Sequence, residues 1–125
     1  QEYDIIDLSN NDIGESIMTK YEMLQTLLND SDLQDSIINE LECGRSEMLL
    51  SEYEPNKFLL DVKIFFVFNS AEILMHTATF EFSLSNFGSI ESFFIRAADR
   101  LTVKDALESA KLGEIIEDFL RSRLN

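Results

Sequence analysis

The chain has 125 residues, of which 45% are hydrophobic, and a formal net charge of −14. This length predicts a single domain over residues 1–125, and the apolar content excludes an intrinsically disordered chain. No apolar run approaches the roughly 20 residues of a membrane span, and the acidic charge repels nucleic-acid phosphates and anionic lipids. We therefore expect neither nucleic-acid nor membrane binding.

The acidic charge is concentrated in the first half of the chain. Residues 1–56 contain 14 Asp and Glu against 2 Lys and Arg, whereas residues 57–125 contain 10 against 8. Such a field favours partners with basic surfaces and speeds encounter with them. The single Cys43 excludes an intrachain disulfide and predicts a reduced, cytoplasmic protein. Because the chain begins with Gln1 rather than Met, a processed or trimmed N-terminus stays open.

Two helices are predicted before the first strand. Apolar residues recur at steps of three and four over about 12–29, which predicts an amphipathic helix. A capping-box pattern at Ser31 predicts a second helix over about 32–43, with Gly44 as the left-handed residue after its end. The short link between them predicts an αα-hairpin. Its outer face carries a predicted partner-binding acidic ridge, which we define as Asp32, Asp35, Glu40 and Glu42.

The middle of the chain predicts a three-stranded antiparallel meander. Apolar residues alternate with period two over 57–68 and 73–84, and 46–53 is a shorter strand-like run. The central strand, 57–68, is largely apolar on both faces, which is typical of a strand covered on both sides. We predict that a homodimer partner or a client segment covers its second face, at Leu59, Phe65 and Val67.

Helices are predicted for the rest of the chain. Ser89 is a suitable cap for a helix over about 89–100. Two further helices are expected over 103–111 and 114–123, separated at Gly113, because the apolar residues before and after it fall on nearly opposite helical faces. In a continuous helix, three cations at steps of four would share one face. That face is either a solvated surface, an internal partner for the acidic ridge, or an anion-binding site formed by Arg96, Arg100 and Lys104.

The sequence contains no catalytic or metal-binding motif. One His and one Cys cannot assemble a structural zinc site, and the carboxylates that follow Asp30 do not fit the calcium loop of an EF-hand. No G-x-S-x-G nucleophile elbow is present. We therefore predict no catalytic residue, no metal and no cofactor. His76 is interpreted as a structural histidine, and the alternative is a small-molecule binder or enzyme with a Phe-lined pocket near His76.

The sequence does not identify one function. We favour a non-enzymatic acidic protein-binding module that engages a basic partner surface. An adaptor, a secretion-chaperone-like protein, an immunity protein or an inhibitor would fit, by analogy of size and charge alone. A DNA-mimicking inhibitor is a further alternative, since its carboxylates would imitate phosphates.

Overall fold

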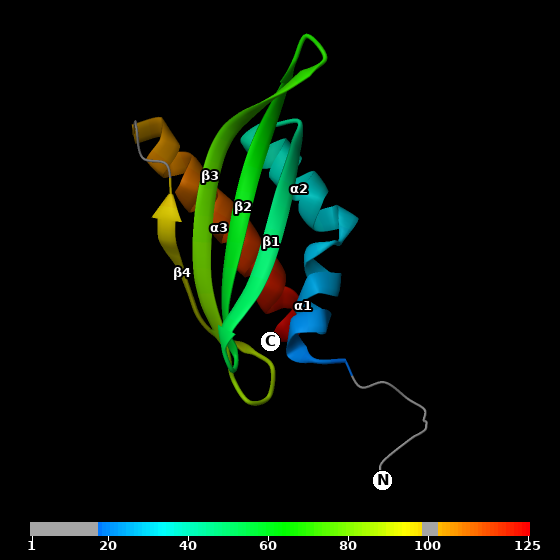
Figure 1. The fold of residues 1–125 in the computed structure, drawn as a ribbon, viewed down its shortest axis with the longest axis vertical. Coiled ribbons are helices and arrows are strands. Elements are labelled where there is room, and N and C mark those ends of the chain that lie inside the picture. Colours follow the sequence, from blue (N-terminus) through cyan, green and yellow to red (C-terminus); the bar gives the residue numbers. More distant parts are fainter. Residues whose placement is uncertain (1–17, 99–102) are drawn as a thin grey trace.

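The computed structural model describes residues 18–98 and 103–125. The described residues form a mixed α+β fold in which three helices lie on one side of a four-stranded antiparallel sheet (Figure 1). The strands follow one another in the sheet in the order β1-β2-β3-β4. Along the chain the elements are α1 (Lys20–Leu28), α2 (Ser31–Leu41), β1 (Arg45–Glu54), β2 (Lys57–Phe68), β3 (Ala71–Leu84), β4 (Ile90–Ala98) and α3 (Val103–Leu124).

The three predicted strands do pair as an antiparallel meander, but the sheet has four strands rather than three, because a further strand forms where a helix was predicted. Residues 90–98 pair with β3 as β4, so the helix predicted over 89–100 is wrong. Phe93 faces the core, where its ring stacks on those of Phe80 and Phe82 at centroid distances of 5.5 and 5.7 Å. Strand preference depends on such cross-strand packing. The edge of β3 therefore decides the structure of a segment that is ambiguous by itself.

The core lies between the sheet and the helices. Alternation along β2 and β3 directs every second side chain toward the helices, and those of Phe58, Leu60, Ile64, Phe80 and Phe82 are fully buried. Each buried side chain of this size contributes roughly 1.5–3 kcal/mol of transfer free energy. The helices complete the core with buried residues at helical spacing, namely Leu24, Leu28, Leu33, Ile37, Leu41, Leu112, Ile116 and Leu120.

Helices α1 and α2 begin and end at recognisable signals. α1 starts at Lys20, after a capping box between Thr19 and Glu22, so Met18 and Thr19 precede the helix in which they were predicted. The part of the predicted helix before residue 18 lies outside the described residues. α2 is capped by Asp30, whose carboxylate accepts a hydrogen bond from the backbone of Asp32 at 2.7 Å. The left-handed residue after α2 is Glu42, with φ 53°, so the role predicted for Gly44 is wrong.

The two helices predicted over 103–111 and 114–123 form one continuous helix, α3. The predicted break is wrong because the apolar residues before it need no cover: Val103 and Leu107 are 78% and 65% exposed. Gly113 lies buried within the helix, where an added Cβ would come within 2.9 Å of the Phe80 ring. It is therefore a site of close packing between α3 and β3 rather than a helix end.

The β2–β3 hairpin extends beyond the helical layer as an arm, which we define as residues 65–75 (Figure 1). The register of the two strands shifts between Ile64 and Phe65, at the base of the arm. At its tip, Asn69 and Ser70 both have positive φ, 52° and 66°. Two consecutive positive φ angles are typical of a type I′ turn, whose twist matches that of the flanking strands.

Candidate protein-interaction surfaces

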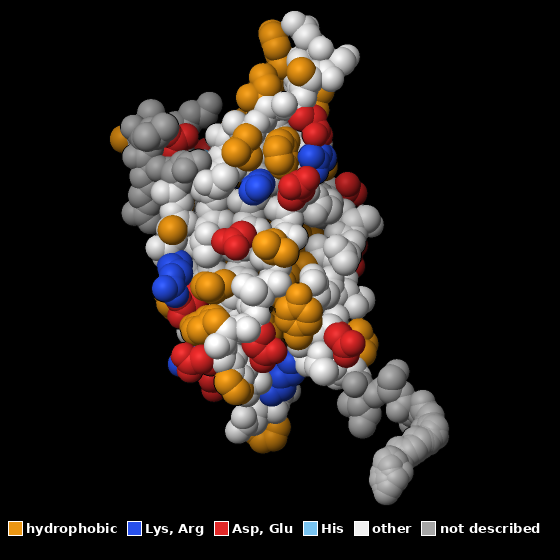
Figure 2. Space-filling model, viewed as in Figure 1, with side chains coloured by type: hydrophobic (Ala, Val, Ile, Leu, Met, Phe, Trp, Pro, Cys, Tyr) orange, Lys and Arg blue, Asp and Glu red, His pale blue; other side chains and the backbone are white. Residues whose placement is uncertain are grey.

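The side of the sheet that faces away from the described helices is the open face. Leu49, Val67, Leu74 and Phe94 lie on it, and between 49% and 66% of each side chain is exposed. The residues predicted to need a cover, Leu59, Phe65 and Val67, all belong to this face, where the first two are partly buried and the third is exposed. Figure 2 shows apolar side chains over the sheet and up to the tip of the arm.

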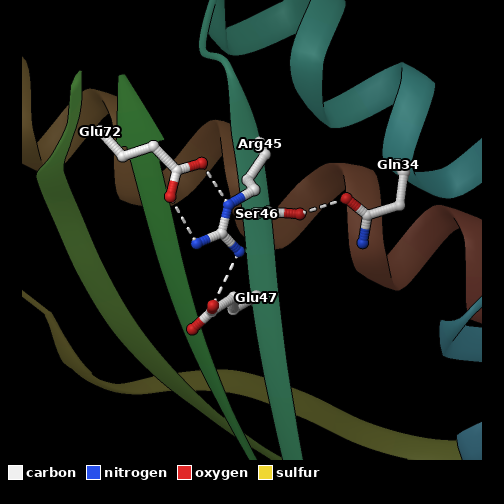
Figure 3. Close-up of polar contacts among 5 residues, drawn as sticks. All are labelled: Gln34, Arg45, Ser46, Glu47 and Glu72. Carbon is white, nitrogen blue, oxygen red and sulfur yellow. Dashed lines mark hydrogen bonds and ion pairs between the residues drawn. The ribbon is translucent and has the colours of Figure 1, made fainter. Parts of the chain in front are cut away.

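Arg45 organises the end of the open face next to the arm (Figure 3). Its guanidinium donates to both carboxylate oxygens of Glu72, at 2.5 and 2.8 Å, and to Glu47 at 2.7 Å. It also lies over the Phe65 ring, 4.4 Å from the centroid. These contacts hold β1 against β2 and the base of the arm. The hydrogen bonds from Arg45 lower the pKa of the Glu72 carboxyl, and the hydrogen bond to Glu72 raises the pKa of Arg45.

Glu81 forms a second cluster toward the other end of the open face. Its carboxylate accepts hydrogen bonds from the Tyr53 hydroxyl and from Arg96, each at 2.5 Å. The Tyr53 bond is the main cause that lowers the pKa of Glu81, and the same bond raises the pKa of Tyr53. Near the middle of the face, Thr79 donates to Asp61 at 2.6 Å. The open face is therefore braced across all four strands.

The charges on the open face nearly balance, although the whole chain is strongly acidic. Cations and carboxylates alternate among the apolar side chains (Figure 2). By the strand register, the face carries Arg45, Lys57, Lys63 and Arg96 against Glu47, Glu54, Asp61, Glu72 and Glu81. Its formal charge is thus close to zero, and nearly all of the −14 of the chain resides elsewhere.

The acidic ridge lies on the helical layer, away from the open face. All four of its side chains are exposed, three on α2 and Glu42 just after it. Arg123 of α3 approaches the start of the ridge, 3.2 Å from Asp30 and 3.9 Å from Asp32. The backbone amide of Asp32 and then Arg123 lower the pKa of Asp30. The rest of the ridge has no ion pair within the described residues.

The three cations considered as an anion site do not share a helical face. Arg96 lies in β4 and pairs with Glu81, whereas Lys104 belongs to α3. Arg100 lies outside the described residues. The continuous helix that would have aligned them does not form.

His76 is a core residue, and only 3% of its side chain is exposed. Its Nε2 lies 2.5 Å from the Ser109 hydroxyl, which itself donates to the Asp105 carbonyl at 3.0 Å. The opposite nitrogen, Nδ1, is buried and has no partner within residues 18–98 and 103–125. This placement joins β3 to α3 and does not resemble the mouth of a pocket.

Other chemical sites receive no support from the described residues. Phe58, Phe80, Phe82 and Phe93 stack on one another at 5.4–5.7 Å, so their rings fill space rather than line a cavity. Burial raises the pKa of the Cys43 thiol, which disfavours the reactive thiolate. Within the same residues, no group of three or more His, Cys, Asp or Glu side chains is arranged to hold a metal ion.

A hollow of about 760 Å³ at the β1 edge was not predicted from the sequence. It lies between the α1–α2 link and β1, where the Ser46 hydroxyl donates to Gln34 Oε1 at 2.6 Å (Figure 3). Its lining is mixed and includes Leu28, Asn29, Gln34, Met48, Leu49 and Lys63. The only sequence signal is that 46–53 begins the meander and is therefore an edge strand.

Two apolar residues of the open face also escaped prediction. Leu74 shares a face with His76 if β3 is regular, but the shift at the base of the arm turns Leu74 toward Phe65. Phe94 was assigned to a helix, whereas in β4 it lies opposite Glu81. Its alternation with Phe93 and Ile95 was the available signal for a strand.

The comparisons with known proteins identify no relative. No protein-family model, curated protein or solved structure significantly matches the chain. Among the described helices, none is both long enough and apolar enough to cross a membrane. The two surfaces above are therefore the basis for any functional proposal.

Proposed function

We propose that this chain is a non-enzymatic protein-binding module that engages a partner with a basic surface. The observation that carries the proposal is the open face, where Leu49, Val67, Leu74 and Phe94 are about half exposed or more on a sheet side that no described helix covers. Several large apolar side chains exposed on one uncovered sheet face indicate an interaction site. The polar side chains on this face form exposed hydrogen bonds and ion pairs that brace the strands against one another.

The acidic ridge supplies the preference for a basic partner. Its exposed carboxylates lie on the opposite layer from the near-neutral open face, so the two surfaces can act independently. Opposite charge across an interface accelerates association more than it tightens the final complex. An adaptor, chaperone-like, immunity or inhibitor role would use this pair of surfaces. The single buried thiol, Cys43, is compatible with the cytoplasm, which we propose as the compartment.

The test begins with capture from a lysate of the native host on the immobilised chain, followed by mass spectrometry. The retained partner is then purified and its association rate measured as salt is raised from about 50 to about 500 mM. We expect a basic partner whose association slows steeply with salt. If that partner binds DNA, competition with a duplex distinguishes the DNA-mimicking version of the proposal.

Two matched variants locate the steering surface. The ridge variant carries Asp32→Asn, Asp35→Asn, Glu40→Gln and Glu42→Gln. The control removes four exposed carboxylates elsewhere, with Glu52→Gln, Glu91→Gln, Glu114→Gln and Asp118→Asn. The ridge variant should associate about tenfold more slowly with little change in melting temperature, and the control should be much less affected. Equal association of the ridge variant and the wild type contradicts the steering role.

The open face is tested with Leu74→Glu together with Val67→Glu. Both side chains are about half exposed, so the fold should tolerate the change. A variant that combines the ridge and open-face substitutions gives the background of the capture experiment. If the wild type captures no protein that this variant fails to capture, the proposed function is overturned.

A further inference from the structure

We propose that the open face is covered by a second copy of this chain, in a two-fold dimer whose sheets pack face to face. The inference rests on the proposed function only in taking this face as a protein-binding surface. It assigns the occupant, and it leaves the acidic ridges of both copies exposed on the outer layers for other partners.

The size and shape of the face fit another sheet. Four strands about 4.8 Å apart, each about ten residues long at about 3.3 Å per residue, give a face of roughly 600 Å². Two such faces bury about 1,200 Å², which reaches the range of specific, stable interfaces. A docked helix, about 10 Å across, would cover only about half of this width. A second sheet at the usual spacing of about 10 Å would cover all of it.

The charges of the face also fit a second copy. A two-fold interface places the same patch on both sides, so the patch must be complementary to itself. The open face satisfies this condition because cations and carboxylates alternate on it and its formal charge is close to zero. Lys63, near the middle, has no ion pair within the described residues; it lies opposite Glu47 of β1 and two residues along β2 from Asp61. Lys63 of one copy can therefore approach a carboxylate of the other.

The location of the acidic ridge favours the same arrangement. Two chains of charge −14 repel each other, and the repulsion is smallest when the acidic layers lie farthest apart. Packing the open faces together puts both sheets, and hence the full thickness of the dimer, between the two acidic ridges. A strongly basic partner would gain nothing from a face that is already neutral, whereas the ridge would attract it.

Sedimentation equilibrium tests the proposal on the intact chain. Over about 10–500 µM, the apparent mass should rise from the 14.4 kDa of the monomer toward twice that value. Because salt screens the repulsion between the two acidic chains, the dimer should tighten as sodium chloride is raised from about 50 to about 500 mM. Binding to a basic partner has the opposite salt dependence, so the two events can be told apart.

Substitutions locate the interface. In a two-fold dimer each change occurs twice, so Leu74→Glu or Val67→Glu should weaken dimerisation more than about 100-fold. Leu107→Glu is the matched control, because it places the same group on an apolar residue of α3 that is 65% exposed on the helical layer. The control should dimerise as the wild type does. Circular dichroism melts of all three variants establish that they remain folded.

Three results would overturn the dimer. They are a wild type that stays monomeric at about 500 µM in high salt, a dimer that survives both open-face substitutions, and a dimer that weakens as salt rises. A monomeric wild type does not remove the proposed function, because loss of a captured partner on changing Leu74 and Val67 would still support it. Loss of dimer with retention of every captured partner would separate the two conclusions in the other direction.

Discussion

Gly113 shows how one missing side chain sets the distance between two elements. It is buried in the middle of α3, and the space that a Cβ would occupy lies 2.9 Å from a ring carbon of Phe80. Phe80 cannot simply move, since it is fully buried and stacks on Phe93 at 5.5 Å. A glycine costs a helix about 1 kcal/mol relative to alanine. Here that cost allows the helix to lie directly on the sheet.

The first prediction concerns Gly113→Ala, a change that stabilises most helices. In this chain we expect it to lower the free energy of unfolding by about 1–3 kcal/mol, because the added methyl overpacks the core against Phe80. Urea denaturation measures the effect. Glu114→Ala, at the exposed neighbouring position, should change stability by no more than about 0.5 kcal/mol. A more stable Gly113→Ala protein would contradict the close packing of α3 on β3.

The second prediction concerns the pH dependence contributed by Asp30. Its pKa is lowered in the folded chain, so it stabilises the fold above its ordinary pKa and this stabilisation is lost as the pH falls through the lowered value. Asp30→Asn keeps a capping side chain but removes the charge that pairs with Arg123. The variant should melt below the wild type at neutral pH, and the two melting temperatures should converge between about pH 5 and about pH 2.

Asp35→Asn is the control for this experiment, because it removes a carboxylate of the same helix that has no ion pair within the described residues. It should not reproduce the convergence. Equal melting temperatures of wild type and Asp30→Asn at pH 7 would show that the contact with Arg123 contributes nothing.

The β2–β3 arm shows what an element adds beyond its sequence pattern. A regular β3 would direct Leu74 and His76 to the same face, but the register shift at the base of the arm sends His76 to the core and Leu74 to the open face. The arm thereby extends the apolar open face past the helical layer. The local signal for such a shift is weak, since it consists of one extra residue in an otherwise alternating run.

The third prediction concerns the turn at the tip of the arm. Ser70 has a φ of 66°, which glycine adopts more readily than serine, and Asn-Gly is the preferred sequence of a type I′ turn. Ser70→Gly should therefore raise the protection of the arm amides against hydrogen exchange, by about 0.5–1 kcal/mol in opening free energy. Ala71→Gly, at the next residue, should lower it. The reverse order of the two variants would contradict the turn geometry.

Sequence patterns predicted the elements whose packing partners are close in the chain. The strands of the meander and the two N-terminal helices follow from periodicity, turns and caps, and the structure confirms that these elements exist. β4 and α3 could not be predicted in the same way. Phe93 and Phe94 suit a helix or a strand, and only pairing with the edge of β3 decides between them. Val103 and Leu107 are exposed apolar residues, and a prediction that assumes apolar residues are buried places them wrongly.

The candidate surfaces also contain some residues that local sequence patterns identify and others that only the folded sheet brings together. Leu59, Phe65 and Val67 could be found because β2 is apolar on its second face as well as its first. Arg45, Glu72, Tyr53 and Glu81 could not, because they are joined only when residues far apart in the chain become neighbours in the sheet. The acidic ridge depends on composition and helical spacing, and these are properties of the sequence alone.

At the scale of the whole molecule, the main feature is the separation of charge from apolar surface. One layer carries exposed carboxylates, and the other is near neutral with large apolar side chains. Net charge far from zero destabilises a compact state through self-repulsion, and salt relieves it.

The fourth prediction follows from that repulsion. In Leu74→Glu, where dimerisation should not contribute, the melting temperature should rise between about 20 and about 500 mM sodium chloride. Adding the four ridge substitutions to this variant should raise the melting temperature at low salt and flatten its salt dependence. If the melting temperature of Leu74→Glu does not depend on salt, repulsion among the carboxylates does not destabilise the folded chain.

The order β1-β2-β3-β4 has a consequence for how the chain folds during its synthesis. Every strand pairs with its neighbour in the sequence, so the sheet can grow one hairpin at a time, and such local contacts favour fast folding. α3 is synthesised after the sheet, however, and it supplies Leu112, Ile116 and Leu120 to the core. Until it emerges, part of the inner side of the sheet is as bare as the outer one. We expect ribosome-stalled chains that end before residue 103 to bind the chaperones that recognise apolar segments, and chains extended past residue 125 by a linker to be released from them. Equal chaperone binding by both lengths would show that the inner side left bare before α3 emerges is not what the chaperones recognise.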